Sequence, residues 1–181
     1  MSLEKKYERI IILGSGGSGK TTLARYMGKA LNIPVYHLDK EYWLPNWERP
    51  DNDVWEEKVK SLVKEPSWIM DGNYIDTLDI RLNEADLVIM LDIKRSVCVA
   101  SVIFRNFKGH FVKRTDINEG CKDAFNKNFF NFITCVKAFK TSYYSKLINL
   151  CIEYPNIDIK LFTTRKGARK FIEEIKSQYE A

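Results

Sequence analysis

The chain has 181 residues, of which 45% are hydrophobic, and its 29 basic and 24 acidic side chains leave a formal net charge of +5. This length and composition predict a single globular domain over residues 1–181 and exclude a low-complexity or disordered chain. The positive excess is mild and interspersed, so it suits a small anionic ligand and makes nucleic acid an unlikely partner class.

Short apolar segments alternate with helical patterns along the chain. The apolar segments predict strands at 9–13, 34–37, 67–71, 86–92 and 157–163. The helical patterns lie at 20–31, 52–65, 94–106 and about 120–152, and a last helix repeats Ala168, Phe171, Ile172, Ile175 and Tyr179. Such alternation is typical of an α/β fold with a parallel sheet. Two irregular segments remain, and they predict an acceptor-binding loop at about 39–51 and a short lid at about 105–119.

A glycine-rich run follows the first predicted strand directly. It reads Gly14-Ser15-Gly16-Gly17-Ser18-Gly19-Lys20-Thr21, fits the spacing G-x-x-x-x-G-K-[ST], and is followed by Thr22 and a helical pattern. In this motif successive backbone N–H groups point into one concavity, and the lysine adds positive charge beside the phosphates. We therefore expect residues 14–22 to bind a nucleoside triphosphate. A Gly-Ser turn without function is the weaker alternative.

Three of the predicted strands are followed by an aspartate. Because ligands bind outside the carboxyl ends of parallel strands, these residues are candidates for a site. We expect Asp71 to hold Mg²⁺ with the Thr21 hydroxyl, directly or through water, and a turn before Gly72 is the alternative. Asp39 is expected to orient or deprotonate an acceptor hydroxyl, or to bind another polar group of the acceptor; a strand-end cap is equally compatible with its position. Asp92 is predicted to cap the next helix.

Phosphoryl transfer requires cations that meet the charge on the transferring group. Arg105 and Arg114 bracket the segment that contains His110, and we assign them with Lys20 to catalysis. Solvated surface charge is the alternative for the two arginines. Lys113 is a weaker candidate for the same role.

The acceptor is expected to contact a set of polar and aromatic side chains near the ends of the second and third strands. The predicted acceptor-binding residues are Asp39, Trp43, Asn73, Tyr74 and Arg81. Trp43 and Trp47 either stack on a planar acceptor or bury their loop against the domain. Arg81 either reaches an anionic acceptor or pairs with Glu84 or Asp86.

Aromatic residues recur at helical spacing late in the chain. They are Phe125, Phe129, Phe132, Ile133, Val136 and Phe139. Their predicted role is core packing, with an acceptor-pocket wall or a subunit contact as the alternative. His37 is interpreted as a strand residue with a satisfied ring, and His110 as a surface group of the lid.

Targeting signals and metal-binding cysteine patterns are not found. Residues 1–9 are charged, which does not resemble a signal peptide, and no apolar run approaches the ~18 residues of a membrane span. The four cysteines are widely spaced without a C-x-x-C pair, so neither a zinc site nor a disulfide framework is predicted. We expect a cytoplasmic protein with reduced thiols. The oligomeric state stays open.

Taken together, these segments resemble the DNA topology modulation proteins, which look like small relatives of adenylate kinase. The resemblance rests on the P-loop, on His37-Leu38-Asp39 with the nearby tryptophans, and on the run 68–74. It implies a P-loop NTPase three-layer αβα fold with a five-stranded parallel sheet in the order 2-3-1-4-5, and ATP with Mg²⁺ as the donor. Nucleoside monophosphate kinases continue Asp-Gly with Phe-Pro-Arg, whereas this chain has Asn73-Tyr74, so their AMP-clasping arginine is missing at that spot.

The leading functional hypothesis is a kinase that transfers the γ-phosphoryl group of Mg-ATP to a nucleoside, a nucleotide or a similar small acceptor. A GTPase switch is excluded, because the guanine-reading Asn-Lys-x-Asp is absent and Gly72 directly follows Asp71. The alternative is a nucleotide-dependent DNA topology modulation protein that binds nucleic acid without kinase turnover. No helix-turn-helix or zinc-finger signature supports it.

Overall fold

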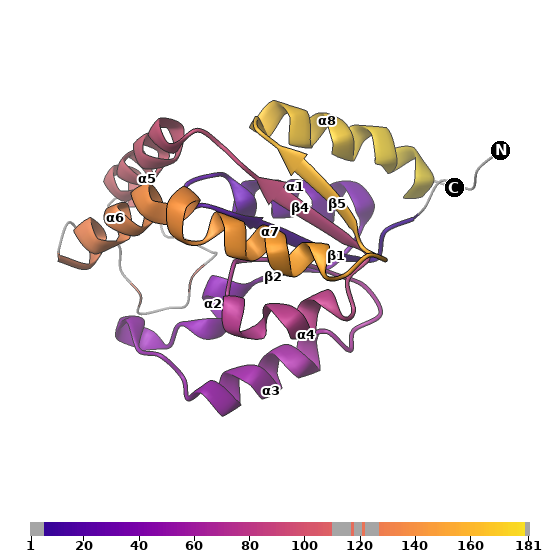
Figure 1. The fold of residues 1–181 in the computed structure, drawn as a ribbon, viewed down its shortest axis with the longest axis horizontal. Coiled ribbons are helices and arrows are strands. Elements are labelled where there is room, and N and C mark those ends of the chain that lie inside the picture. The colour runs from indigo at the N-terminus through magenta and orange to yellow at the C-terminus, as the bar shows by residue number, and fades with distance from the viewer. Residues whose placement is uncertain (1–5, 110–116, 118–120, 122–126, 180–181) are drawn as a thin grey trace.

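One parallel sheet organises the computed structural model, which describes residues 6–109, 117, 121 and 127–179. Five strands follow the order β2-β3-β1-β4-β5, and every neighbouring pair is parallel (Figure 1). The strands are β1 (Arg9–Gly14), β2 (Val35–His37), β3 (Trp68–Asp71), β4 (Leu87–Leu91) and β5 (Asp158–Phe162). The predicted P-loop NTPase sheet and its strand order are thereby confirmed.

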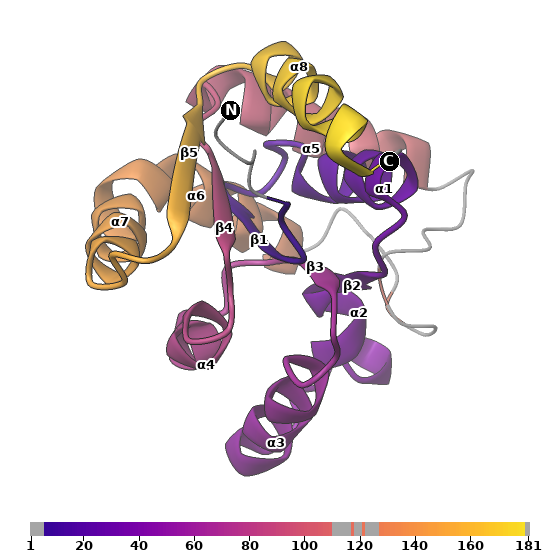
Figure 2. The ribbon, with the colours of Figure 1, turned by 90° about the vertical axis from the view of Figure 1, so that its right-hand side faces the viewer.

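Helices cover both faces of this sheet (Figures 1 and 2). One face packs against α1 (Lys20–Leu31), α5 (Arg95–Gly109) and α8 (Arg165–Lys176). The other face packs against α3 (Asn52–Leu62), α4 (Leu78–Leu82) and α7 (Tyr144–Ile152). The remaining helices are α2 (Leu38–Tyr42), which follows β2, and α6 (Lys127–Ser142). Because α6 contributes Val136 to the first core and Phe139 to the second, it contacts both layers.

The central strands β1, β3 and β4 are apolar except for Arg9 and Asp71 at their ends, because both of their faces are covered. In β1 the side chains of Ile10 and Ile12 enter the core on the α1 side, and those of Ile11 and Leu13 enter the core on the α3 side. All four are 0% exposed. A strand buried in this way shows a continuous hydrophobic run instead of alternation, which is why the sequence located it well.

The predicted helical stretch over about 120–152 is helical within the described residues, but it is divided into two helices. Within the described residues this stretch forms α6 and α7, separated at Tyr143, whose φ of −120° departs from helical geometry. Phe139 before the break and Leu147 and Cys151 after it enter the same core, so the apolar period continues across it. Periodicity alone therefore could not reveal the boundary. Phe125 lies outside the described residues.

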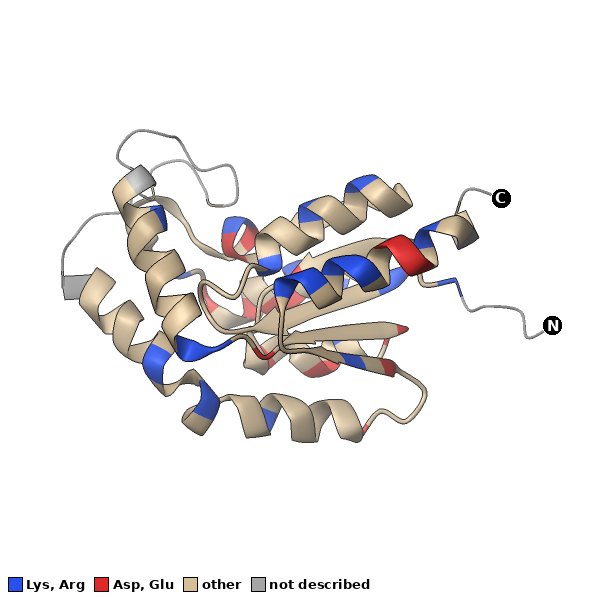
Figure 3. Ribbon diagram, turned by 90° about the horizontal axis from the view of Figure 1, so that it is seen from above, with Lys and Arg blue, Asp and Glu red and all other residues tan. Residues whose placement is uncertain are grey.

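The surface carries mixed charge (Figure 3). In α8 the basic residues Arg165, Lys166, Arg169 and Lys170 are followed by Glu173 and Glu174. The four cysteines are free thiols, three of them buried. Among the described helices, none combines the length and the hydropathy that crossing a membrane would require.

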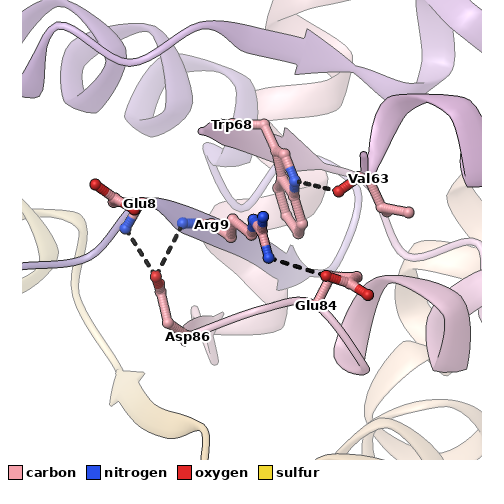
Figure 4. A network of polar contacts seen from close by, with 6 residues as sticks. All are labelled: Glu8, Arg9, Val63, Trp68, Glu84 and Asp86. Atoms are coloured by element: carbon pink, nitrogen blue, oxygen red, sulfur yellow. Dashed lines mark hydrogen bonds and ion pairs between the residues drawn. The ribbon is translucent and has the colours of Figure 1, made fainter. Parts of the chain in front are cut away.

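A small polar network stabilises the end of the sheet at which the strands begin (Figure 4). One carboxylate oxygen of Asp86 accepts hydrogen bonds from the backbone N–H groups of Glu8 at 2.8 Å and Arg9 at 3.1 Å. The Arg9 guanidinium pairs with Glu84 at 2.9 Å. This network fixes the start of β1 next to β4, at the opposite end of β1 from the glycine-rich run.

Close packing of α1 on β2 gives a stability prediction. A Cβ at Gly28 would lie 2.3 Å from Cγ2 of Val35 and 2.9 Å from the Ile33 carbonyl oxygen. In an exposed helix a glycine-to-alanine change stabilises by about 0.5–1 kcal/mol. Here Gly28→Ala should instead lower the free energy of unfolding by about 1–3 kcal/mol through overpacking, measured by denaturant titration.

The matched control is Gly167→Ala in α8. Its Cβ would meet only side-chain atoms, at 3.1 Å from Thr164 Oγ1 and 3.6 Å from Phe162 Cδ1, so a smaller effect is expected. Equal stability of the Gly28→Ala variant and the unmodified protein would contradict the packing described for α1.

Candidate functional site

The glycine-rich run forms a P-loop between the end of β1 and the start of α1. Gly17 has φ +76°, in the left-handed region that side chains rarely adopt. A Cβ there would also lie 2.3 Å from the Cys98 carbonyl oxygen of α5. Since α1 begins at Lys20, the free N–H groups of its first turn face the same concavity. This backbone geometry fits a phosphate chain.

Lys20 lies at the centre of a group of charges. Its Nζ donates hydrogen bonds to the carbonyl oxygens of the first two P-loop residues, at 2.9 and 3.1 Å. Burial lowers the pKa of Lys20; the carboxylates of Asp39 and Asp71 oppose this change, and Arg105 adds to it. The structure thus brings these four predicted site residues close enough to influence one another. Arg105 lies within α5 and not in a loop.

The two predicted metal ligands are in direct contact. The Thr21 hydroxyl donates to Oδ2 of Asp71 at 2.8 Å, and Asp71 is only 5% exposed. A hydroxyl and a carboxylate are hard oxygen ligands of the kind that Mg²⁺ prefers. Across the described residues, no group of three or more His, Cys, Asp or Glu could hold a metal by itself. The pair therefore fits an ion that takes its other ligands from phosphate and water.

His37 completes this arrangement: it is a strand residue with a satisfied ring, as predicted, but the sequence did not reveal that Asp71 is its partner. Its Nδ1 contacts Oδ1 of Asp71, and its Nε2 accepts a hydrogen bond from Nε of Arg25 at 3.3 Å. An accepting Nε2 leaves the proton on Nδ1, which then donates to the carboxylate. The available signal was positional, because His37 and Asp71 are register partners at the ends of β2 and β3.

Asp39 lies in the first turn of α2, two residues after the end of β2 at His37. Its exposed carboxylate accepts a hydrogen bond from the Tyr74 hydroxyl at 2.8 Å. Burial, together with the Asp39 charge and this hydrogen bond, raises the pKa of Tyr74. Two predicted acceptor-binding residues are therefore joined, and Tyr74 stays protonated at neutral pH.

The aromatic residues of the 39–51 loop pack on one another. Tyr42 lies with ring centroids 5.0 Å from Trp43, 5.1 Å from Trp55 and 4.8 Å from Tyr74, and Trp43 lies 5.6 Å from Trp47. Trp43 and Trp47 keep partly exposed rings. The contacts favour burial of the loop over an open stacking platform.

Asn73 and Arg81 both bond to backbone groups, and of the two only Arg81 is placed differently from the prediction, because Asn73 also lines the cavity beside the P-loop. The Asn73 side-chain amide exchanges two hydrogen bonds of 3.0 Å with the backbone N–H and carbonyl of Gly14. Arg81 is 0% exposed, and its contacts are backbone carbonyls, so it neither faces an anionic acceptor nor pairs with Glu84 or Asp86. Both side chains therefore hold backbone segments of the site in place by hydrogen bonds.

Asp92 is not the predicted helix cap. The helix α5 begins at Arg95, and the Asp92 carboxylate pairs with Nζ of Lys140 at 2.9 Å. This ion pair fixes α6 to the end of β4. The other predicted lid residues, Arg114, Lys113 and His110, lie outside the described residues.

Arg165 contacts the P-loop, and the sequence analysis did not single it out. Arg165, the first residue of α8, donates from Nε to the Ser18 carbonyl at 2.9 Å and from Nη2 to the Gly17 carbonyl at 2.6 Å. The sequence could have indicated Arg165 by its position, because it follows the fifth strand at the same end of the sheet as the other site residues.

A cavity of about 480 Å³ lies beside the P-loop. Its lining combines P-loop, turn and helix residues: Ser15, Gly16, Asn73, Tyr74, Ile75, Asp76, Phe132, Cys135, Val136, Phe139, Tyr143 and Lys146. This volume is within the usual range of about 300–1,000 Å³ for small-molecule sites. Phe132 is 39% exposed, while Val136 and Phe139 are buried, so the aromatic face of α6 serves both core and cavity.

No family model matches the chain, and no curated protein does. Solved structures do match. Shikimate kinase from Bacteroides thetaiotaomicron is 13% identical, with a TM-score of 0.54 over 97% of this chain and 100% of that chain. Shikimate kinase from Aquifex aeolicus is 16% identical, with a TM-score of 0.51 over 95% and 96% of the two chains.

A third similar structure is shikimate kinase from Acinetobacter baumannii in complex with shikimate. It is 14% identical, with a TM-score of 0.57 over 94% of this chain and 92% of that chain. At such identities the likeness concerns the fold. The chain therefore has the fold of the small P-loop kinases.

Proposed function

We propose that this chain is a phosphotransferase that moves the γ-phosphoryl group of Mg-ATP to a hydroxyl group of a small acceptor. The observation that carries the proposal is the cavity of about 480 Å³ that borders the P-loop, with Tyr74 in its lining and Asp39 bonded to Tyr74. A nucleotide switch needs only a phosphate site. A second pocket beside that site is what a two-substrate enzyme requires.

The residues divide into a donor half and an acceptor half. The P-loop backbone and Lys20 would hold the phosphates of ATP, and Thr21 with Asp71 would hold Mg²⁺. When bound, Mg-ATP supplies the phosphoryl group and the cation that neutralises it. Asp39 would orient the acceptor hydroxyl and accept its proton, while Arg105 would meet charge on the transferring group. Arg114 keeps the same proposed role.

The acceptor that this cavity suits is a ring compound with hydroxyl groups. Phe132, Phe139 and Tyr143 offer an aromatic wall, and Asp76 and Lys146 add one charge of each sign. A nucleoside or nucleotide fits this lining, as proposed from the resemblance to adenylate kinase relatives. Shikimate, present in one similar structure, is a second ring acceptor worth the same test.

The deciding assay follows ADP release with Mg-ATP and a panel of nucleosides, nucleotides, shikimate and other hydroxylated metabolites. Acceptor-dependent ADP release with a phosphorylated product identifies the substrate. If no panel member is phosphorylated, and ADP release stays at the level of the acceptor-free reaction, the proposal is wrong.

Membership in the DNA topology modulation family, and nucleic-acid binding with it, is the less supported proposal. The basic start of α8 is followed by Glu173 and Glu174, and Arg165 is hydrogen-bonded to the P-loop. A duplex-binding protein would shift DNA in a gel with steep salt dependence. We expect no shift at low salt.

Lys20→Met should abolish phosphotransfer and preserve the fold. The side chain contacts the P-loop backbone instead of packing in a core, and loss of one group that stabilises transition-state charge costs about 10²–10³-fold in kcat. The measurements are kcat and the thermal unfolding midpoint. Lys29→Met, on the exposed side of the same helix, is the control and should keep full activity.

Asp39→Asn should lower kcat by about 10²–10⁴-fold, because general-base catalysis contributes about that much. ADP affinity, measured by calorimetry, should stay within twofold. Tyr74→Phe removes only the hydrogen bond to this carboxylate and should cost less. A parallel loss of ADP binding in Asp39→Asn would assign Asp39 to structure instead.

His37→Ala should weaken Mg²⁺ binding about 10–100-fold, as expected when a group that orients a metal-binding carboxylate is lost. The measurement is calorimetric titration of Mg²⁺ into the ADP complex, which does not depend on turnover. His37→Asn keeps an N–H donor near Asp71 and should retain most of the affinity. Unchanged Mg²⁺ binding in both variants would rule out this role.

A further inference from the structure

Arg81 is a buried cation with an unusual set of partners. Its side chain is 0% exposed, and its hydrogen bonds go to four backbone carbonyls. Nη1 donates to Gly72 at 3.0 Å, and Nη2 donates to Asn73 at 2.7 Å and Tyr74 at 2.9 Å. Nε donates to Thr77 at 3.4 Å. One guanidinium thus holds three successive carbonyls of the turn that follows β3.

Placing a guanidinium there is unfavourable by itself. Burial lowers the pKa of Arg81 to about 9, which shows that the surroundings oppose its charge. A leucine or methionine would fill the same core volume without this desolvation cost. What only arginine offers is a rigid planar fork of five N–H donors.

The turn that Arg81 holds is strained. Gly72 has φ +142°, and a Cβ there would lie 2.9 Å from Cβ of Leu38. Tyr74 has φ +29°, which is rare for a residue with a side chain. Such backbone persists only where its surroundings impose it, and it concentrates at functional sites.

Each residue of this turn contacts a different part of the site. Asp71, just before it, contacts Thr21. Asn73 bonds to the Gly14 backbone at the start of the P-loop, and the Tyr74 hydroxyl bonds to Asp39. The turn is therefore the physical link between the proposed donor half and the proposed acceptor half.

We propose that Arg81 is a positioning residue that holds the 72–74 turn in its strained form and thereby aligns the P-loop with Asp39. This role rests on the proposed function for its kinetic consequence, but its structural part does not. Arg81 is 0% exposed and is not among the residues that line the cavity. It acts through Asn73 on Gly14 and through Tyr74 on Asp39.

Amide hydrogen exchange tests the structural part without any turnover. In Arg81→Lys the amide of Gly14, which donates to Asn73, should exchange at least about tenfold faster, while the amide of Ile12 in the same strand changes little. Arg9→Lys, at a surface ion pair, is the control and should change neither amide. If both amides accelerate by the same factor, Arg81 contributes only to global stability and the proposal fails.

Kinetics test the alignment. Arg81→Lys should lower kcat by about 100-fold, the loss expected from a displacement of about 1 Å at a reacting group. In the Asn73→Ala/Tyr74→Phe background the same change should lower kcat no further, although it still lowers the unfolding midpoint. Full additivity of the kinetic losses would overturn the proposal.

Two results separate this proposal from the proposed function. Faster Gly14 exchange in Arg81→Lys, together with absence of phosphotransfer by the unmodified protein, would refute the kinase and support the positioning of the turn. If no Arg81 variant folds, nitrogen-15 spectra of the unmodified protein decide. A locked side chain gives separate Nη signals and a slowly exchanging Nε–H, whereas a single averaged Nη signal would overturn the proposal.

Discussion

The two hydrogen bonds between the Asn73 amide and the Gly14 backbone hold the site together. The ladder between β1 and β3 ends at the pair Ile12 and Asp71, and the Gly72 N–H still reaches the Ile12 carbonyl at 3.2 Å. Asn73 then extends this pairing with a side chain, because an amide offers both a donor and an acceptor. The side chain of Asn73 therefore links the turn after β3 to the P-loop.

The P-loop and the neighbouring cavity differ in what they require of the sequence. The phosphate cradle uses backbone N–H groups and a helix terminus, which need a particular backbone path and few particular side chains. The cavity beside the P-loop is lined largely by side chains from the turn and from α6, whose identities set its shape and charge. The similar structures, at 13–16% identity, therefore show a shared fold and do not identify what the cavity binds.

The strands were located within one residue at each end. The central strands β1, β3 and β4 are covered on both faces and form apolar runs, whereas the edge strands β2 and β5 are partly exposed and stood out as short apolar segments between helical patterns. Errors occurred at polar side chains. Arg81 was expected to meet an opposite charge but bonds to backbone carbonyls, and Asp92 was expected to cap a helix but pairs with Lys140. The sequence does not reveal which backbone carbonyl a side chain such as Arg81 will bond to, because every residue carries one.

The sequence by itself determined the P-loop and the parallel α/β class, because glycine spacing and apolar periodicity are local properties of the chain. Only the tertiary structure decided that His37 supports Asp71, 34 residues away, and that Arg165 contacts the P-loop residue Ser18 across 147 residues. It also decided that α6 closes a cavity against the turn after β3. These contacts depend on strand register and helix placement, which the packing of the whole chain sets.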